Sequence, residues 1–505
     1  MKRTGQQSGL PVIVLVGFMV ATIPTASADY KALREAIEAN NIGKVVHLIE
    51  NDPEDVNRYE YLSDSPLHIA AHYGRVEIAE YLLSKGMDPN IRCPGAGRPL
   101  MDAAQQGHMD MVMLLHEHEA DINAGCNGGS SALFGAVSSG HLPVAEYLIQ
   151  HGASLTSKTQ SGTSLLHAAR DAKIAELLLQ NGADKVLEDG ETSCGTTPLA
   201  EAVRRNRPDV AELYMKYGAD PEFTTRNGGT LLHLAAQGGS TTLINRFVQM
   251  GFEVDGLDNL GRSPLHGAVV WGHIDAVRLL VSRGADIQRE SNAAETPLRL
   301  AAPRGHIDVA SFLLSLGADI EARCDRGLTP LLAASATGQA AMVTMLEKAG
   351  ADPHARCNHE NTILHYAAQG NDTTLIKTCV EWGVDINARN KGGGTPFHLA
   401  AGQFRSGIRN TCVNRLTIAQ GLLELGADVN ASSNNGTTPL HMAVAARDGD
   451  PRMVTLLLEA GADPFMTNDD EQTPLLLAIE EGHDESARLL LEAMTEDTYS
   501  NVRND

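Results

Sequence analysis

The sequence contains few aromatic residues. Phe, Trp and Tyr make up 4% of its 505 residues, and only two of them are Trp. With so few bulky side chains, a chain of this length is not expected to build one large central core. Its stability is predicted to come from many small Leu and Ala contacts between neighbouring elements.

The sequence also lacks the short motifs of common enzymes. It has no His-Glu-x-x-His, no Gly-x-Ser-x-Gly and no Gly-Lys-Ser/Thr phosphate loop. Its seven cysteines are never closer than 22 residues, which excludes Cys-x-x-Cys. No segment outside the repeats described below is long enough for a catalytic domain. We therefore expect no enzyme activity, no cofactor, and no catalytic or metal-binding residues.

Positive charge is scarce. Lys and Arg total 40 against 63 Asp and Glu, which gives a net charge of −23. Nucleic acid is not expected as a partner, because phosphate binding needs a basic face. Such acidity suits a protein that meets neutral or basic protein surfaces. It equally suits a long chain that only has to stay soluble.

Long apolar runs are also missing. The apolar stretch from Leu10 to Ile23 spans 14 residues, which is short for a membrane span of about 20. It follows a basic start and precedes Ala26-Ser27-Ala28, a small-x-small cleavage pattern. Residues 1–28 are therefore predicted to be a secretory signal peptide, cleaved before Asp29. An uncleaved N-terminal apolar anchor is the alternative, and we expect no other membrane span.

Cysteine usage favours the cytoplasm over a secretory compartment. The number of cysteines is odd, so at least one thiol is free or pairs between chains. Four of them recur at the same repeat position, where neighbouring copies lie about 10 Å apart, too far for a disulfide: Cys93, Cys126, Cys324 and Cys357. The localisation favoured by residues 1–28 is secretory or extracellular, with cytoplasmic as the alternative.

A phrase close to Thr-Pro-Leu-His-x-Ala-Ala recurs every 33 residues. Its Pro position falls at 66, 99, 132, 165, 198, 231, 264, 297, 330, 363 and 396, and two wider steps then reach 439 and 474. This period predicts stacked units, each of which buries its apolar face only against its neighbours. Well-preserved copies are Thr296 to Ala302 and Thr395 to Ala401. The phrase and its period resemble the ankyrin repeat.

Each repeat is predicted to be a helix, a turn, a second helix and a finger. Thr before Pro is typical of a helix start, because the hydroxyl caps free N–H groups and Pro fits the first helical position. Gly ends the first helix, as at Gly74, and another Gly ends the second, as at Gly86. About ten polar or Gly-containing residues then form a hairpin-like finger.

The predicted fold class is an all-α ankyrin-repeat solenoid, elongated and curved. About fourteen repeats are expected between residues 29 and 494, followed by a C-terminal tail at 495–505. The fifth repeat is short after His167, and the finger that follows it is long and acidic. Glu119 takes a helix-ending position that is Gly elsewhere, where we expect mild strain. An insertion at about 402–417 contains three arginines: Arg405, Arg409 and Arg415.

Most histidines follow the repeat. Twelve of the 19 occupy the phrase or follow the turn Gly, and the resemblance implies that those of the phrase tie neighbouring repeats together. His116 and His118 form the densest remaining cluster. Two residues apart on a helix, they point to different faces, so no metal site is expected.

The resemblance implies that a protein partner binds the concave side of the stack. The position before the turn Gly varies while the scaffold around it repeats, and Trp271 is its most distinctive member because Trp is a favoured interface anchor. Packing of that ring over a neighbouring turn is the alternative. From this row and the insertion we select as candidate partner-binding residues Tyr73, Gln106, Arg205, Trp271, Arg304, Arg405 and Arg409. If the chain is secreted by a eukaryote, the candidate glycosylation sites are Asn371, Asn430 and Asn435.

The sequence therefore predicts a non-catalytic, monomeric interaction scaffold or adaptor that binds a partner protein on its concave face. Two alternatives remain open. One is a secreted or surface effector that binds a foreign target through the same face. The weaker one is a regulatory subunit of a separate enzyme chain.

Overall fold

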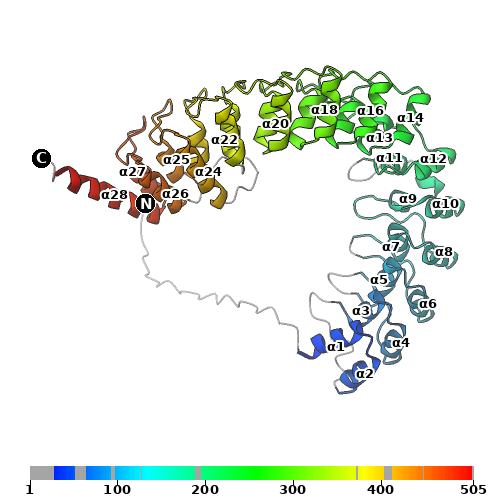
Figure 1. Cartoon of the computed structure of the whole chain (residues 1–505). Helices are drawn as coiled ribbons and strands as arrows, with labels where there is room; N and C mark the ends of the chain where they lie inside the picture. Colours follow the sequence, from blue (N-terminus) through cyan, green and yellow to red (C-terminus); the bar gives the residue numbers. More distant parts are fainter. Residues whose placement is uncertain are drawn as a thin grey trace, which may run out of the picture. The chain divides into compact units, whose positions relative to one another are not determined.

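The computed structural model describes residues 28–51, 64–92, 97–126, 128–187, 195–370, 373–402, 412–446 and 449–502. The chain forms two compact units, which meet in the sequence between Leu187 and Glu188. Both units are built from pairs of short helices joined by turns and fingers (Figure 1).

In the first unit the helices form two parallel rows. The first helix of each repeat packs against the first helix of the next, and the second helices make a second row beside them (Figure 1). The first helices are α1 Ala28–Glu38, α3 Pro66–His72, α5 Pro99–Gln106, α7 Ala132–Ser139 and α9 Leu165–Ala168. The second helices are α2 Ile42–Asn51, α4 Val76–Ser84, α6 Met109–Glu117, α8 Leu142–Gln150 and α10 Ala172–Gln180, followed by a 3₁₀ turn at Ala183–Val186.

The second unit repeats the same two rows. Its first helices are α11 Pro198–Arg204, α13 Leu231–Gln237, α15 Pro264–Val270, α17 Pro297–Ala301, α19 Pro330–Ala336, α21 Ile363–Gln369, α23 Pro396–Ala401, α25 Pro439–Val444 and α27 Pro474–Glu480, with a 3₁₀ turn after α17 at Ala302–Arg304. Its second helices are α12 Pro208–Lys216, α14 Thr241–Gln249, α16 Ile274–Ser282, α18 Ile307–Ser315, α20 Ala340–Lys348, α22 Thr373–Glu381, α24 Cys412–Glu424, α26 Pro451–Glu459 and α28 Asp484–Val502. The predicted all-α fold of stacked helix pairs is confirmed.

The phrase forms the start of each first helix, as predicted. In α23, Thr395 is the N-cap and Pro396 the first helical residue, and His398 completes a capping box with the cap. The Nδ1 of His398 accepts the backbone N–H of Thr395 at 3.1 Å, while its Nε2 donates to the carbonyl of Thr437 in the next repeat at 3.0 Å. The phrase histidine therefore both caps its own helix and holds the neighbouring repeat.

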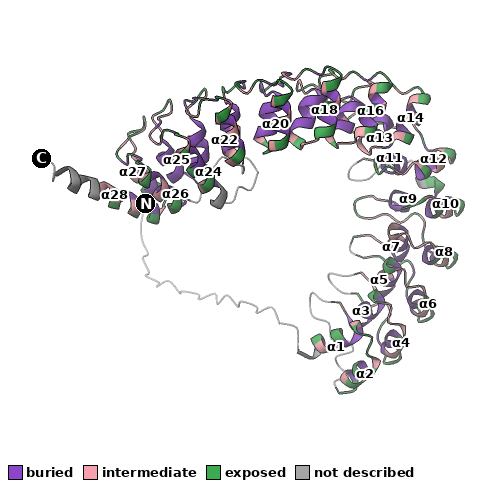
Figure 2. Ribbon diagram, in the orientation of Figure 1, coloured by how far each residue is buried: buried purple, intermediate pink, exposed green. Residues whose placement is uncertain are grey.

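The apolar face of each pair is closed only by the adjoining pairs. In the repeat of α15 and α16, the side chains of Leu265, Ala268, Ala276 and Leu280 are fully buried. Figure 2 shows the same pattern along the second unit, where buried residues fill the facing sides of α16, α18 and α20. The small side chains of Ala268 and Ala276 let the helices approach closely.

Successive fingers of the second unit are joined by backbone hydrogen bonds. The N–H of Asn259 donates to the carbonyl of Asn227 at 2.8 Å, and the N–H of Asn292 donates to the carbonyl of Leu260 at 2.9 Å. Between later fingers, arginine side chains add three hydrogen bonds. In each of them a guanidinium donates to a carbonyl of the next finger: Arg323 to Arg356, Arg356 to Arg389, and Arg389 to Ser432. The described residues contain no β-strand, so the fingers are hairpin-like turns.

Two repeats depart from the regular pattern. Helix α9 has four residues where the other first helices from α3 onward have five to eight, in line with the shortened fifth repeat. The acidic finger after it, residues 188–194, lies outside the described residues. At the insertion, α24 begins at Cys412 and has 13 residues, so the last part of 402–417 is helical. Arg415 is buried there, and its Nη2 donates to the carbonyl of Ala401 at 2.6 Å.

The last helix runs beyond the expected end of the repeats. Helix α28 continues to Val502, so much of the predicted tail at 495–505 is helical. The helix-ending Gly of the other repeats is replaced here by Met494, and no left-handed residue stops the helix. The repeat count and the remaining domain bounds stay predictions.

Candidate functional site

The predicted variable row of the second unit lies where the first helices end. Trp271 is the C-cap of α15, and its N–H donates to the carbonyls of Gly267 and Val269. Gly272 follows with φ +73°, which turns the chain sharply and directs the preceding side chain outward. The Trp271 side chain is 64% exposed, so its ring is not covered by a neighbouring turn.

The finger of the same repeat carries two more exposed apolar side chains. Leu257 and Leu260 are each 50% exposed. The finger is held by Asp258, whose carboxylate accepts the N–H and the guanidinium of Arg262 at 2.8–3.0 Å. Although burial raises the pKa of Asp258, its hydrogen bonds with Arg262 hold it below the ordinary value overall. One repeat thus presents Trp271 at one end of α15, and Leu257 and Leu260 in the finger that precedes its other end. We call these three residues the α15 surface.

The repeat that carries the α15 surface is fastened on both sides. The Nε2 of His266 donates to the carbonyl of Glu295 in the following finger at 3.0 Å. The Nε2 of His273 donates to the carbonyl of Gln237 in the preceding repeat, also at 3.0 Å. These contacts confirm that the phrase histidines tie neighbours together, and they fix the backbone that displays Trp271.

The two arginines of the row are held within their own helices. Arg205 pairs with Glu201, which also binds Arg204 at 2.9 Å. Arg304 donates from Nη1 to the carbonyl of Leu300 at 2.9 Å. The repeat between those of Arg205 and Trp271 has Gly238 in the variable row. This repeat therefore contributes no side chain to the row.

In the first unit the row contains Tyr73 and Gln106. Tyr73 is 39% exposed at the C-cap of α3, with the guanidinium of Arg75 5.9 Å from its ring centroid. Gln106 is exposed at the end of α5. One turn before it, burial and the charge of Asp64 raise the pKa of Asp102 to about 7.

Three of the selected residues fall outside the described part of the chain. They are Arg405, Arg409 and the acceptor Asn371. Asn430 lies between repeats, where its amide donates to the carbonyl of Gly461 at 3.0 Å and accepts the N–H of Asp463 at 2.8 Å. Asn435 is exposed in a finger, and its side chain accepts a hydrogen bond from Ser433.

The titratable side chains show structural roles. Burial lowers the pKa of six phrase histidines, and that of His365 falls to about 4; the six are His68, His233, His266, His365, His398 and His441. His116 bonds through Nδ1 to the hydroxyl of Tyr147 at 2.8 Å, and its ring lies 4.8 Å from that of His151. In the described parts of the chain, no group of three or more His, Cys, Asp or Glu side chains could hold a metal ion.

Four cysteines are free thiols: Cys126, Cys324, Cys357 and Cys379. Cys324 and Cys357 are buried at the same place in successive fingers, and Cys379 is buried in α22, where burial raises the pKa of its thiol to about 12. Burial also acts to raise the pKa of Cys324, but backbone N–H groups and the charge of Arg299 lower it overall. Arg299 occupies the phrase position of histidine and pairs with Glu295 at 2.8 Å.

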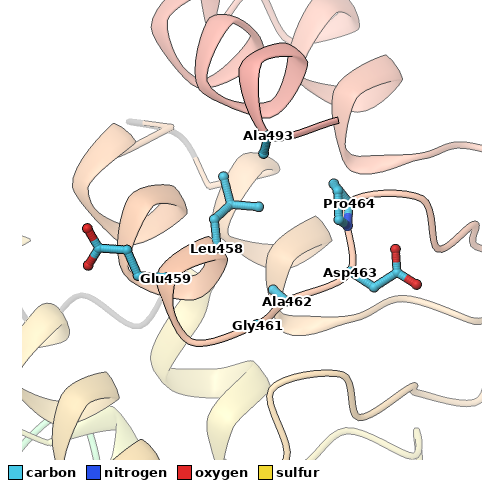
Figure 3. Close-up of a pocket in the computed structure, with 7 residues that line it drawn as sticks. All are labelled: Leu458, Glu459, Gly461, Ala462, Asp463, Pro464 and Ala493. Atoms are coloured by element: carbon cyan, nitrogen blue, oxygen red, sulfur yellow. The ribbon is translucent and has the colours of Figure 1, made fainter. Parts of the chain in front are cut away.

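A hollow lies near the end of the second unit. It has a volume of about 520 Å³ and is lined by Leu458, Glu459, Gly461, Ala462, Asp463, Pro464 and Ala493. Figure 3 shows Leu458 of α26 pointing towards Ala493 of α28 across this space. The lining has small apolar groups and two carboxylates, and it gathers no set of side chains suited to catalysis.

The sequence reasoning missed the finger residues Leu257 and Leu260. The available signal was two large apolar residues in a segment that is polar or rich in Gly in most other repeats. It also missed Leu476, Ile479 and Leu491, which are large apolar side chains exposed in the last repeat.

Comparison with known proteins identifies the family. Profiles of ankyrin repeats match residues 94–159, 199–291, 288–357 and 410–502, and a second ankyrin-repeat profile matches residues 48–96 and 345–400. The first profile alone matches more than half of the chain, so the chain belongs to the ankyrin repeat family. Ankyrin repeats are in general modules of protein–protein interaction.

Two individual similarities are more limited. A stretch of 73 residues is 40% identical to the human 2-5A-dependent ribonuclease, covering 14% of this chain and 10% of that protein. The chain thus spans about a tenth of the ribonuclease's length. The solved structure of the human ASB11 ankyrin repeat domain matches with 24% identity and a TM-score of 0.39, over 46% of this chain and 99% of that domain.

The helices were also compared with the requirements of a membrane span. Within the described residues, none is both long enough and apolar enough to cross a bilayer.

Proposed function

We propose that this chain is a non-catalytic interaction scaffold whose protein partner binds the second unit across the α15 surface. The observation that carries the proposal is the exposure of Trp271 at one end of α15 and of Leu257 and Leu260 in the finger that precedes its other end. Exposed apolar side chains on a fixed backbone favour association, because a partner removes them from water at little ordering cost. Trp is also among the residues most often found at the centre of interfaces.

The arginines of the row are proposed to act at the rim of this interface. Arg205 and Arg304 already satisfy part of their hydrogen bonding within their own helices, so a partner gains little from them directly. Charged groups at a rim mainly steer association and set its salt dependence.

The non-catalytic part of the proposal rests on how the titratable groups are used. In His365, for example, Nδ1 accepts the N–H of Thr362 and Nε2 donates to the carbonyl of Gly394. A ring with both nitrogens engaged in holding repeats together has none left for proton transfer to a substrate.

The proposal is tested by capture on matched variants. We expect proteins retained by the tagged chain to be lost from W271A/L257S/L260S. They should be kept by M250S/L316S, which removes exposed apolar side chains from the ends of two second helices of the same unit. With a purified partner, the loss should be at least about 30-fold in Kd, as for an interface hot spot. Equal retention by all three baits would rule out the α15 surface.

Export remains a proposal that rests on residues 1–28. An exported chain should begin at Asp29, and an intact mass that still includes Met1 to Ala28 would contradict export. On eukaryotic export we expect a glycan at Asn435, which is exposed. A glycan on Asn430 would be attached to the amide nitrogen that donates to the carbonyl of Gly461 in the next repeat, so it would compete with that hydrogen bond. An effector that binds a foreign target would use the same α15 surface.

A further inference from the structure

The last repeat of the second unit exposes an apolar face. Leu476 and Ile479 of α27 and Leu491 of α28 are 42%, 62% and 55% exposed. We call these three residues the end face. They are independent of the α15 surface, which lies on a different repeat.

In the preceding repeat, the same positions all face their neighbour. His441, the counterpart of Leu476, is fully buried, and its Nε2 donates to the carbonyl of Gln472 in the last repeat. Val444, the counterpart of Ile479, is fully buried, and its carbonyl accepts a hydrogen bond from His483. Leu458, the counterpart of Leu491, points towards α28 across the hollow (Figure 3). The end face is therefore the surface that the next element of a stack would cover.

Two side chains of the end face differ from those that most repeats present to the following repeat. Leu476 takes the place of the histidine that caps its helix and bonds to the following finger. Ile479 takes a position that is Ala in α21 and α23 and Val in α25, where first helices approach closely. A bulkier side chain at that point holds the next helix away. The partner must therefore present a surface that fits over projecting Leu and Ile side chains, as an amphipathic helix does.

The charges around the end face favour a partner that carries positive charge. Between Pro474 and Met494 there are five carboxylates and one guanidinium. That guanidinium, of Arg488, is already paired with Glu485 at 2.8 Å and with Glu492. Glu480 ends α27 and Glu481 is its C-cap, so both lie at the negative end of the helix dipole, where a cation would be favoured.

The same charges disfavour a second copy of this chain as the occupant. Two end faces meeting each other would bring like-charged rims together on chains that each carry a net charge of −23. We propose that the end face binds an amphipathic helix of a partner protein, with its Leu-rich stripe on Leu476, Ile479 and Leu491 and its flanking Lys or Arg side chains on the carboxylates around them.

The test uses a labelled model helix and matched variants of the full chain. The probe is a fluorescent Leu/Lys peptide of about five helical turns, with leucines at helical spacing on one face. Binding is followed by fluorescence anisotropy in about 0.15 M NaCl, where nonspecific attraction between exposed charges is screened beyond about 8 Å. We expect L476S/I479S/L491S to weaken binding by about tenfold or more.

The control is L257S/L260S/W271S, which removes three exposed apolar side chains without changing the charge. It should bind the peptide as the unmodified chain does. Circular dichroism checks that each variant stays folded, and I479S alone replaces the triple variant if that one unfolds. E480Q/E492Q should weaken binding and reduce its salt dependence.

Two outcomes would overturn the proposal. If both triple variants or neither of them weaken binding, the peptide is held by overall charge and not by the end face. If sedimentation detects a dimer of the chain that L476S/I479S/L491S abolishes, the occupant is a second copy. The control variant removes the three side chains of the α15 surface. The result for the end face therefore does not depend on whether the proposed scaffold function is correct.

Discussion

At the residue scale, the second helices from α4 to α26 are each followed by a residue in a left-handed backbone conformation. Gly86 adopts φ +88° there, while Glu119 occupies the equivalent position one repeat later with φ +67°. A residue with a Cβ is strained in this region by about 1 kcal/mol. We expect E119G to raise the free energy of unfolding by up to that amount, measured by urea denaturation.

The reciprocal change is the control for this prediction. A Cβ added at Gly86 would meet no atom within 4 Å, so G86A isolates the backbone strain from any steric clash. It should lower the free energy of unfolding by about 1 kcal/mol. Destabilisation by E119G would mean that the Glu119 side chain makes a contact worth more than the strain.

At the element scale, the start of each first helix makes stability depend on pH. In the second unit, burial lowers the pKa of His233, His266, His365, His398 and His441. The unfolded chain then binds more protons than the folded chain below pH of about 6.5. Stability is therefore full above this pH and is lost as the pH falls towards 4. For His365 alone, with its pKa at about 4, the loss at pH 5 is about 2 kcal/mol.

Urea unfolding at pH 7 and pH 5 measures this loss. H365Q lowers stability at both pH values but should reduce the difference between them, because Gln does not titrate. Asp102 of the first unit acts in the opposite sense, since its raised pKa favours the folded state at lower pH. A stability that rises from pH 7 to pH 5 would contradict the role given to the histidines.

The elements differ in how far sequence could predict them. Thr395, Pro396 and His398 predicted the start of α23 correctly, because capping is a local interaction within one turn. The course of α28 past Met494 was not predicted, because the repeat pattern ends there and only the missing Gly hinted at it. The α-helical start of α24 inside the insertion was missed for the same reason: no repeated phrase covers it.

At the scale of the whole molecule, net charge should govern the response to salt. A charge of −23 opposes the compact state through self-repulsion, which salt screens as the Debye length falls from about 30 Å at 0.01 M to about 10 Å at 0.1 M. We expect the thermal midpoint to rise over this range of NaCl, as followed by circular dichroism.

A charge-reversal variant provides the comparison. Glu253 and Glu459 are exposed, and E253K/E459K brings the net charge from −23 to −19, since each reversal adds two units. Its midpoint should depend less on salt. If the midpoint of the unmodified chain instead fell with salt, the surface ion pairs would outweigh the self-repulsion.

The sequence by itself determined the all-α fold, the helix pairs and the scaffold role of the phrase histidines. It did so because the 33-residue period repeats the same local interactions in every copy. Only the tertiary structure decided which side chains remain uncovered. Leu491 and Leu458 hold the same repeat position, yet Leu458 faces α28 and Leu491 is 55% exposed. Trp271, Leu257 and Leu260 likewise became one candidate surface only through the exposure that packing leaves them. Exposure depends on neighbours in space, which a repeated sequence pattern does not specify.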